Sequence, residues 1–202
     1  MVKAFSYDSG SFEIANLLQF NQVDYLAVAY ADEGVTLRSS GISLPIMVMS
    51  PDLSSLETLV EYKREPEIFS FENLTSFIRL LEKMGIKHYP IHIKLDSGMN
   101  RLGFNPEDLT KIVEILKGSD NVKIESVFSH LAGADDPIHD DFSRKQIAIL
   151  NSFSQALSKE LHYKFLTHIA NTAAISRFPE AELDMVRLGI GLYGISSVLE
   201  QG

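Results

Sequence analysis

Short runs of β-branched and apolar residues alternate with longer helix-like stretches along the whole chain of 202 residues. This alternation is typical of a parallel α/β sheet whose strands are joined by helices. No linker rich in Pro, Gly or Ser interrupts the pattern, so residues 1–202 are expected to form one domain. The eight predicted strands cover residues 2–5, 25–30, 45–50, 67–70, 89–96, 122–129, 165–170 and 183–189.

Helices are predicted where apolar residues recur at spacings of three and four. Gly85 is suited to end one of them, and Asn105 followed by Pro106 is suited to begin another. The clearest predicted helices cover residues 11–20, 71–84, 106–116 and 140–157.

Eight strand–helix units predict a (β/α)8 TIM-type barrel, although such barrels usually need about 250 residues. The first strand begins almost at Met1 and only residues 190–202 follow the last, so we expect a barrel that is incomplete at both ends. An open doubly wound sheet is the alternative, because the same alternation would serve it. Neither a G-x-G-x-x-G nor a G-x-x-x-x-G-K-[ST] phosphate loop occurs to support that alternative.

Charge and composition narrow the class of partner. The chain has 18 Lys and Arg against 27 Asp and Glu, a net charge of -9, which disfavours a nucleic-acid partner. It has no Cys, so it has no disulfide, no thiolate metal site and no cysteine nucleophile, and no metal site is predicted. No apolar run approaches the roughly 20 residues of a membrane span, and no signal peptide is recognisable. We therefore expect a cytoplasmic protein without a membrane partner.

Basic side chains occur where buried parallel strands should be almost wholly apolar. In the predicted strand 89–96, alternation places His92, Lys94 and Asp96 on one face and apolar residues on the other. The carboxyl ends of barrel strands meet at one opening, so basic groups at these ends predict an anionic small ligand. The alternative is that such groups are structural, as they would be if Lys94 merely paired with Asp96. The five basic groups are Lys3, Lys94, His130, His168 and Arg187.

Two loops that follow predicted strands contain repeated glycines. The loop 96–104 also carries Arg101, whose planar guanidinium can make a two-point contact. The segment 187–194 follows the last strand, where barrels often hold a phosphate on backbone N–H groups. Tight turns and close packing are the alternative reason for these glycines.

Taken together, several segments resemble the alanine racemases, which are fold-type III pyridoxal 5'-phosphate enzymes. They are MVKAFSY (1–7), HIKLDSGMNRLGF (92–104), FSHLA (128–132), HIANTAA (168–174) and MVRLGIGLYG (185–194). The resemblance implies an isomerase that converts L-alanine to D-alanine for bacterial peptidoglycan. It also implies pyridoxal 5'-phosphate as cofactor, an amino acid as substrate, and a homodimer.

The resemblance assigns roles to individual residues. Lys3 would be the Schiff-base lysine and one of two catalytic acid/base groups. Arg101 would reach the phenolic oxygen of the cofactor, with Lys94 behind it, a position that is often carbamylated in the family. Arg187 would face the pyridine nitrogen and be held by His168. His130 would hydrogen-bond toward the second base, and the residues around the phosphate would be Tyr7, Asn171, Thr172, Gly189 and Ile190.

Physical chemistry agrees with these roles. A cofactor bound as an imine on Lys3 delocalises the carbanion formed when the substrate loses its α-hydrogen, and racemisation then needs acid/base groups on both faces. A guanidinium has a pKa above ~12 and is a poor proton donor. Arg187 is therefore expected to leave the ring nitrogen unprotonated and to disfavour transamination.

Departures from the family pattern limit the expected activity. The family's second base is a tyrosine from the C-terminal β-domain of the partner subunit, and these 202 residues contain no counterpart of that domain. Asp8 stands where the family usually has glycine and is expected to weaken phosphate binding by like-charge repulsion. We expect a barrel-domain fragment that has the cofactor site but little racemase activity.

Two other functions remain open from the sequence. A non-catalytic module that binds pyridoxal 5'-phosphate on the same barrel would also fit the missing second base. A related amino acid decarboxylase is the third possibility. It is disfavoured because decarboxylases of this fold place a carboxylate near the ring nitrogen, where Arg187 stands here.

Overall fold

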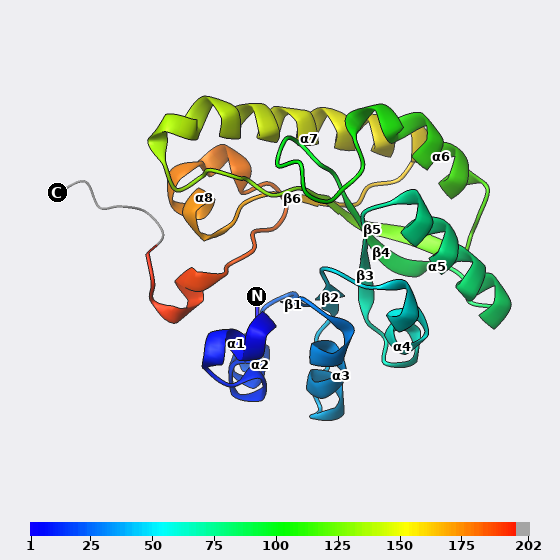
Figure 1. Ribbon diagram of the computed structural model, residues 1–202, viewed down its shortest axis with the longest axis horizontal. Helices are drawn as coiled ribbons and strands as arrows, with labels where there is room; N and C mark the ends of the chain where they lie inside the picture. The colour runs from blue at the N-terminus through cyan, green and yellow to red at the C-terminus, as the bar shows by residue number, and fades with distance from the viewer. Residues whose placement is uncertain (197–202) are drawn as a thin grey trace.

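The computed structural model describes residues 1–196 and contains one sheet of parallel strands surrounded by helices (Figure 1). The six strands lie in the order β1-β2-β3-β4-β5-β6, so neighbours along the chain are also neighbours in the sheet. A doubly wound sheet would instead reverse its strand order at a switch point, so that alternative is wrong. The strands are β1 Leu26–Val28, β2 Ile46–Val48, β3 Glu65–Ile68, β4 Tyr89–Lys94, β5 Val122–Phe128 and β6 Leu166–His168.

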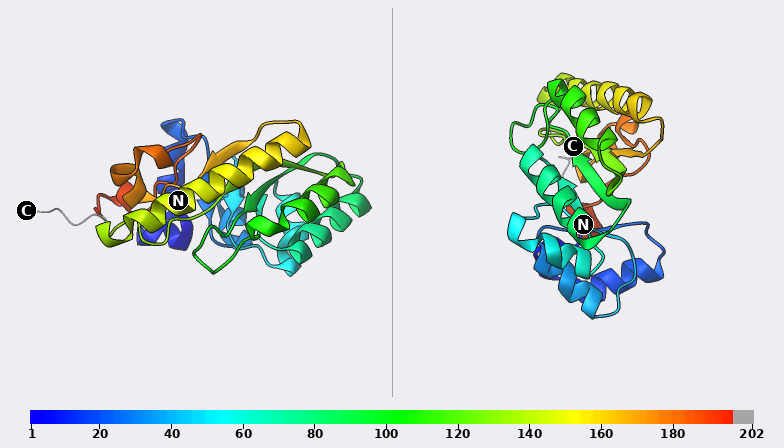
Figure 2. Two further views of the ribbon diagram at one scale, coloured as in Figure 1. Left: turned by 90° about the horizontal axis from the view of Figure 1, so that it is seen from above. Right: turned by 90° about the vertical axis from the view of Figure 1, so that its right-hand side faces the viewer.

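Helices connect the strands and cover the outer side of the curled sheet (Figures 1 and 2). The α-helices are α1 Lys3–Asp8, α2 Ser11–Phe20, α3 Ala31–Ser39, α4 Leu56–Glu61, α5 Phe71–Met84, α6 Leu109–Lys117, α7 Asp140–Leu161 and α8 Thr172–Arg177. Five short 3-10 helices are also described: η1 Leu53–Ser55, η2 Pro106–Asp108, η3 Pro137–His139, η4 Pro179–Ala181 and η5 Ile190–Tyr193. None of the helices in residues 1–196 combines the length and the apolar character that a membrane crossing requires.

All four predicted helices are present. α2 and α5 have the predicted bounds, η2 and α6 together occupy the third, and α7 continues past residue 157 to Leu161. Gly85 ends α5 in the left-handed conformation with φ 69°. Asn105 begins η2, where its backbone N–H donates to the Asp108 carboxylate at 2.9 Å. Both predicted caps are therefore confirmed.

The main hydrophobic core contains apolar side chains from the strands and from the helices that cover them. Ile91 and Ile93 of β4 are fully buried in the same cluster as Phe77 and Leu81 of α5. The alternation predicted for β4 is confirmed, because His92 lies on the other face and hydrogen-bonds to the side chains of neighbouring strands. Strand β4 thus has an apolar outer face and a polar inner face.

The first and last of the eight predicted strands are wrong. The four residues 4–7 have φ of 52–53°, so α1 is largely a left-handed turn, and from residues 2–5 only Val2 joins the sheet, donating to the Ala27 carbonyl at 2.9 Å. Left-handed backbone costs an ordinary L-residue about 1–2 kcal/mol, and neither propensity nor alternation can foresee it. Such strain persists only where surrounding contacts impose it, often at functional sites.

Segment 183–189 runs beside β6 without forming a strand. Asp184 and Arg187 donate backbone hydrogen bonds to the carbonyls of Thr167 and Ala170 at 3.1 and 3.0 Å. The amino group of Met1 donates to the Leu188 carbonyl at 2.9 Å. Single hydrogen bonds therefore link the two ends of the six-stranded sheet, and the fold is the incomplete (β/α)8 barrel that the alternation predicted.

Candidate active site at the carboxyl ends of the strands

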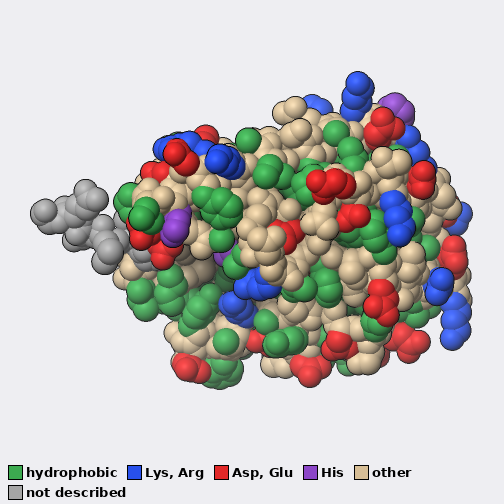
Figure 3. All heavy atoms as spheres, turned by 45° about the horizontal axis from the view of Figure 1, so that its top comes forward, with side chains coloured by type: hydrophobic (Ala, Val, Ile, Leu, Met, Phe, Trp, Pro, Cys, Tyr) green, Lys and Arg blue, Asp and Glu red, His purple; other side chains and the backbone are tan. Residues whose placement is uncertain are grey.

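A cavity of about 670 Å³ opens at the carboxyl ends of the strands, a volume within the usual range for small-molecule sites. Four of the five predicted basic groups line it, namely Lys3, Lys94, His130 and Arg187. His168 is fully buried and reaches the site through its contact with Arg187. On the face drawn in Figure 3, Lys and Arg side chains gather near the centre. The predicted residues that also line the cavity are Tyr7, Arg101, Asn171, Thr172, Gly189 and Ile190.

Lys3 is positioned by the left-handed turn that follows it. The carboxylate of Glu33 at the start of α3 accepts hydrogen bonds from the backbone N–H of Ala4 at 2.6 Å and of Ala29 at 2.7 Å. This carboxylate ties the turn to the loop after β1. Within residues 1–196 no hydrogen bond or ion pair engages the Lys3 amine, so it is available to a ligand in the cavity. The sequence pattern gave no sign of Glu33, because its partners are backbone groups.

Thr172 organises another part of the cavity wall. Its Oγ1 accepts hydrogen bonds from the N–H groups of Gly189 at 3.0 Å and Gly191 at 3.3 Å. A Cβ on Gly191 would lie 2.5 Å from Thr172 Cγ2, so close packing requires glycine there. The ring of Tyr7 packs 5.0 Å from that of Tyr193. These groups place two hydroxyls and a glycine backbone around one region.

Two residues that the sequence linked to phosphate binding, Asn171 and Asp8, do not both present a free group to the cavity. The Asn171 side chain caps α8 by accepting from the Ala174 N–H at 3.0 Å, so its amide oxygen already has a structural partner. Asp8 is exposed and is absent from the residues found to line the cavity in the described chain. A repulsive effect of Asp8 on a phosphate therefore has to act from outside the cavity wall.

Arg187 is held rigidly on the inner side of the barrel. Its guanidinium donates to the backbone carbonyls of Ser129 at 2.6 Å and Ile169 at 3.2 Å, and to Nδ1 of His168. Burial lowers the pKa of Arg187 to about 10, and the nearby Glu67 carboxylate opposes that shift. Arg187 is therefore a fixed cation at neutral pH.

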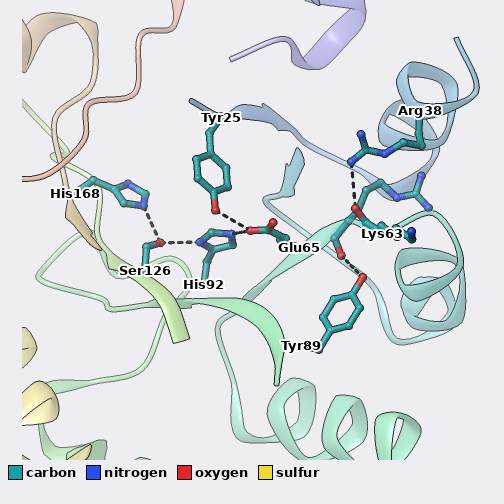
Figure 4. A network of polar contacts seen from close by, with 9 residues as sticks. Tyr25, Arg38, Lys63, Glu65, Tyr89, His92, Ser126 and His168 are labelled. Atoms are coloured by element: carbon teal, nitrogen blue, oxygen red, sulfur yellow. Dashed lines mark hydrogen bonds and ion pairs between the residues drawn. The ribbon is translucent and has the colours of Figure 1, made fainter. Parts of the chain in front are cut away.

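His168, which accepts a hydrogen bond from Arg187, begins a chain of hydrogen bonds across the sheet. Figure 4 shows this chain from His168 to Glu65. His168 Nε2 lies 2.9 Å from Ser126 Oγ, Ser126 Oγ lies 2.7 Å from His92 Nδ1, and His92 Nε2 lies 2.9 Å from the Glu65 carboxylate. We call these four residues, His168, Ser126, His92 and Glu65, the relay.

The donor at one end of the relay fixes every proton along it. Arg187 can only donate, so Nδ1 of His168 is an acceptor and Nε2 of a neutral His168 carries the proton. That proton is donated to Ser126, whose own hydroxyl then donates to Nδ1 of His92, and Nε2 of His92 donates to Glu65. Burial, followed by the charge of Arg187, lowers the pKa of His168 well below its usual range, which agrees with the neutral form.

His168 and His92 were conspicuous in the sequence as polar residues on predicted strands, but Ser126 and Glu65 were not. The only sign of them in the sequence is that each is a polar residue on a strand, Ser126 on β5 and Glu65 on β3, where helices cover the sheet. The Tyr25 hydroxyl also donates to Glu65 at 3.1 Å. The relay thus ends on a carboxylate that two donors hold.

His130 follows β5 and faces the same cavity. Its Nδ1 lies 3.4 Å from the Arg187 guanidinium. Burial, followed by the charges of Arg187 and Lys94, lowers the pKa of His130 to about 3. The imidazole is therefore neutral at physiological pH.

Lys94 does not form the structural pair that the sequence left open. Across the described residues no ion pair joins Lys94 to Asp96, whose Oδ1 instead accepts from the N–H groups of Gly98 at 2.9 Å and Asn100 at 3.1 Å. The Lys94 amine lies 4.5 Å from the centre of the Phe128 ring. Lys94 is therefore directed to the cavity, and Asp96 shapes the loop that carries Arg101.

Glu67 is a cavity residue that the sequence analysis missed. It was treated as the first residue of a predicted strand, and its carboxylate was given no role. Its side chain lines the cavity with a relative exposure of 2%. Burial raises the pKa of Glu67 to about 7, opposed by the charges of Lys94, Arg187 and Arg101. A buried carboxylate thus lies among the cations.

Comparison with known proteins identifies the family. The model of the alanine racemase N-terminal domain matches residues 1–197. The chain is 36% identical over 197 residues to alanine racemase of Methanococcus maripaludis, which covers 96% of this chain and 52% of that protein. It is 38% identical over 196 residues to alanine racemase of Carboxydothermus hydrogenoformans, again covering 96% of this chain and 52% of that protein.

Solved structures agree with this result. The chain superposes on alanine racemase of Clostridium difficile 630 with a TM-score of 0.89 at 34% identity, covering 98% of this chain and 56% of that one. The chain therefore spans about half the length of the relatives it matches. Because the family model extends over almost the entire sequence, the chain belongs to the alanine racemase N-terminal domain family.

Proposed function

We propose that this chain binds pyridoxal 5'-phosphate in the cavity and supplies the cofactor-binding barrel of an alanine racemase, which interconverts L- and D-alanine. One observation carries the proposal. Lys3, whose amine has no partner within residues 1–196, lines the same cavity as the buried, fixed cation Arg187. An aldehyde-bearing anion needs both features, because a free amine condenses with the aldehyde and cations offset the negative charge.

The residues present fit such a cofactor. The hydroxyls of Thr172 and Tyr7 lie in one wall with Gly189 and Ile190, and these hydroxyl donors suit a phosphate. The Gly189 N–H donates to Thr172 Oγ1, so it positions that hydroxyl. Asn171 also lines the cavity, and its side-chain oxygen caps α8. When bound, the cofactor supplies an electron sink that acidifies the α-hydrogen of the substrate.

The remaining groups orient the bound molecule and control protons. Lys3 Nζ would hold the cofactor covalently and, once released from it, would move a proton on one face of the substrate. Arg187 would face the ring nitrogen and leave it unprotonated, because a guanidinium held at a pKa of about 10 gives up its proton poorly. Arg101 would bind the phenolic oxygen, and neutral His130 would accept or donate one hydrogen bond toward the second acid/base group.

We further propose that the 202-residue chain alone racemises alanine slowly. Racemisation requires a second acid/base group on the other face of the substrate, which the resemblance assigns to a tyrosine of the partner subunit's C-terminal domain. The whole racemase is accordingly proposed to be a cytoplasmic homodimer that makes D-alanine for peptidoglycan.

A cofactor titration followed by an activity assay tests both proposals. Binding of pyridoxal 5'-phosphate is measured by absorbance for the wild type and for Lys3→Ala, with Lys123→Ala, which alters an exposed lysine of β5, as the matched control. We expect an imine absorbance band in the wild type and the control but not in Lys3→Ala. An identical band in all three proteins would refute the role of Lys3. Racemisation by the 202-residue chain at the rate of an intact enzyme would refute the need for a second domain.

A further inference from the structure

Glu67 and Lys94 face each other from neighbouring strands on the inner side of the barrel. Glu67 of β3 is paired in register with His92 of β4, and Lys94 is two residues further along β4 on the same face. Both side chains line the cavity, and their relative exposures are 2% for Glu67 and 6% for Lys94. The two charged groups therefore share one largely dry space.

Neither group has a polar partner inside the protein. Throughout residues 1–196, no hydrogen bond or ion pair within 4.0 Å engages the carboxylate of Glu67 or the amine of Lys94. A carboxylate buried to this extent requires a nearby positive charge, because desolvation of an isolated ion costs several kcal/mol. The cations that act on Glu67 are Lys94, Arg187 and Arg101, and Lys94 has the largest effect.

We propose that Glu67 is the anion of this side of the cavity, that it holds Lys94 as an unmodified ammonium, and that it anchors Arg101. This inference differs from the expectation that Lys94 is carbamylated. The assignment of Lys94 rests on the cavity alone, whereas the use of Arg101 toward a cofactor rests on the proposed function.

Carbamylation requires a neutral amine. The nitrogen lone pair attacks the carbon of carbon dioxide, a C–N bond forms, and one proton leaves the nitrogen for solvent. An ammonium has no lone pair for this step. Burial lowers the pKa of Lys94 to about 8, and Glu67 is the strongest group that opposes the shift, ahead of Asp96, while Arg187 and Arg101 favour it. The Glu67 carboxylate therefore favours the ammonium form of Lys94.

Charge also disfavours the product. A carbamate would place a second anion beside the Glu67 carboxylate in a dry cavity, where like charges repel strongly. The same carboxylate suits Arg101, which lines the cavity, is exposed and has no partner in the described part of the chain. A guanidinium binds a carboxylate through two parallel hydrogen bonds, so Glu67 can supply the anionic anchor that a carbamate would otherwise provide.

Carbon-13 NMR of cofactor-free protein in labelled bicarbonate tests the proposal directly. At neutral pH we expect no Lys94 carbamate signal in the wild type, and at least a tenfold stronger signal in Glu67→Gln. The signal should disappear in the double variant Glu67→Gln with Lys94→Met. Two controls should match the wild type: Glu67→Asp, which keeps the charge, and Glu72→Gln, which neutralises an exposed carboxylate of α5.

Cofactor affinity provides a second measurement. Bicarbonate should leave pyridoxal 5'-phosphate binding unchanged in the wild type and should strengthen it several-fold in Glu67→Gln, where a carbamate can replace the lost anion. A Lys94 carbamate in the wild type would overturn the proposal, and so would folded Glu67→Gln without one. If Glu67→Gln does not fold, the nitrogen-15 shift of wild-type Lys94 Nζ decides, because a neutral amine at neutral pH would contradict it. Absence of cofactor binding in every protein would refute the proposed function but leave the carbamate comparison valid.

Discussion

Ser126→Ala should destabilise the fold strongly, because Ser126 is the central link of the relay. Its side chain is fully buried, and its hydroxyl lies 2.7 Å from His92 Nδ1 and 2.9 Å from His168 Nε2. Alanine leaves one acceptor and one donor without partners, and each orphaned buried group costs about 1–3 kcal/mol. The expected loss is therefore about 2–6 kcal/mol, from a total stability that is typically about 5–15 kcal/mol.

Urea unfolding of the wild type, Ser126→Ala and Ser143→Ala measures this effect. Ser143 of α7 is the matched control, because its hydroxyl is equally buried but has no hydrogen-bond partner among the residues described. Removing an unpaired buried hydroxyl should leave the free energy of unfolding unchanged or raise it. If Ser126→Ala and Ser143→Ala unfold at the same urea concentration, the reasoning about the relay is wrong.

Further predictions concern protonation and reaction control. His130 should show no imidazole titration in NMR spectra between pH 5 and pH 8, because burial lowers its pKa to about 3; a midpoint near the ordinary value would contradict this. The pKa of Glu67 is raised from 4.5 to about 7. Between these two pH values the folded chain binds more protons than the unfolded chain. The free energy of unfolding should therefore fall as the pH rises from 4.5 to about 7. Denaturant unfolding at several pH values should show this fall in the wild type and not in Glu67→Gln, and equal pH profiles would refute it. In an active, complete racemase, Arg187→Glu should protonate the ring nitrogen and increase conversion of the cofactor to its amine form, measured by chromatography; unchanged products would count against the role of Arg187.

Much of the barrel could be predicted because its local signals agree with its tertiary structure. The inner and outer faces of β4 followed from strict alternation, and the bounds of α5 followed from periodicity together with Gly85. The first strand was misplaced because residues 2–5 read as a short apolar run, whereas residues 4–7 adopt a left-handed turn in which Ala4 is bound by the distant Glu33. α3 was missed because its residues carry a weak apolar pattern and its start depends on the same Glu33.

Some residues of the candidate site could be predicted from the sequence and others could not. Basic residues at strand ends were conspicuous in the sequence, and the structure brings Lys3, Lys94, His130 and Arg187 to one cavity. Glu67 and Ser126 were not conspicuous, because a single acidic or hydroxyl residue on a strand carries no sign of which neighbour it meets. Their significance depends on the register between strands, which a sequence pattern does not specify.

Covalent trapping tests the central claim most directly. The chain is mixed with pyridoxal 5'-phosphate, reduced with borohydride, digested and mapped by mass spectrometry, with Lys94→Arg as a variant that retains a cation in the cavity. We predict a phosphopyridoxyl group on Lys3 in both proteins. A label on another lysine, or no label at all, would contradict the claim that the Lys3 amine is the group that captures the cofactor.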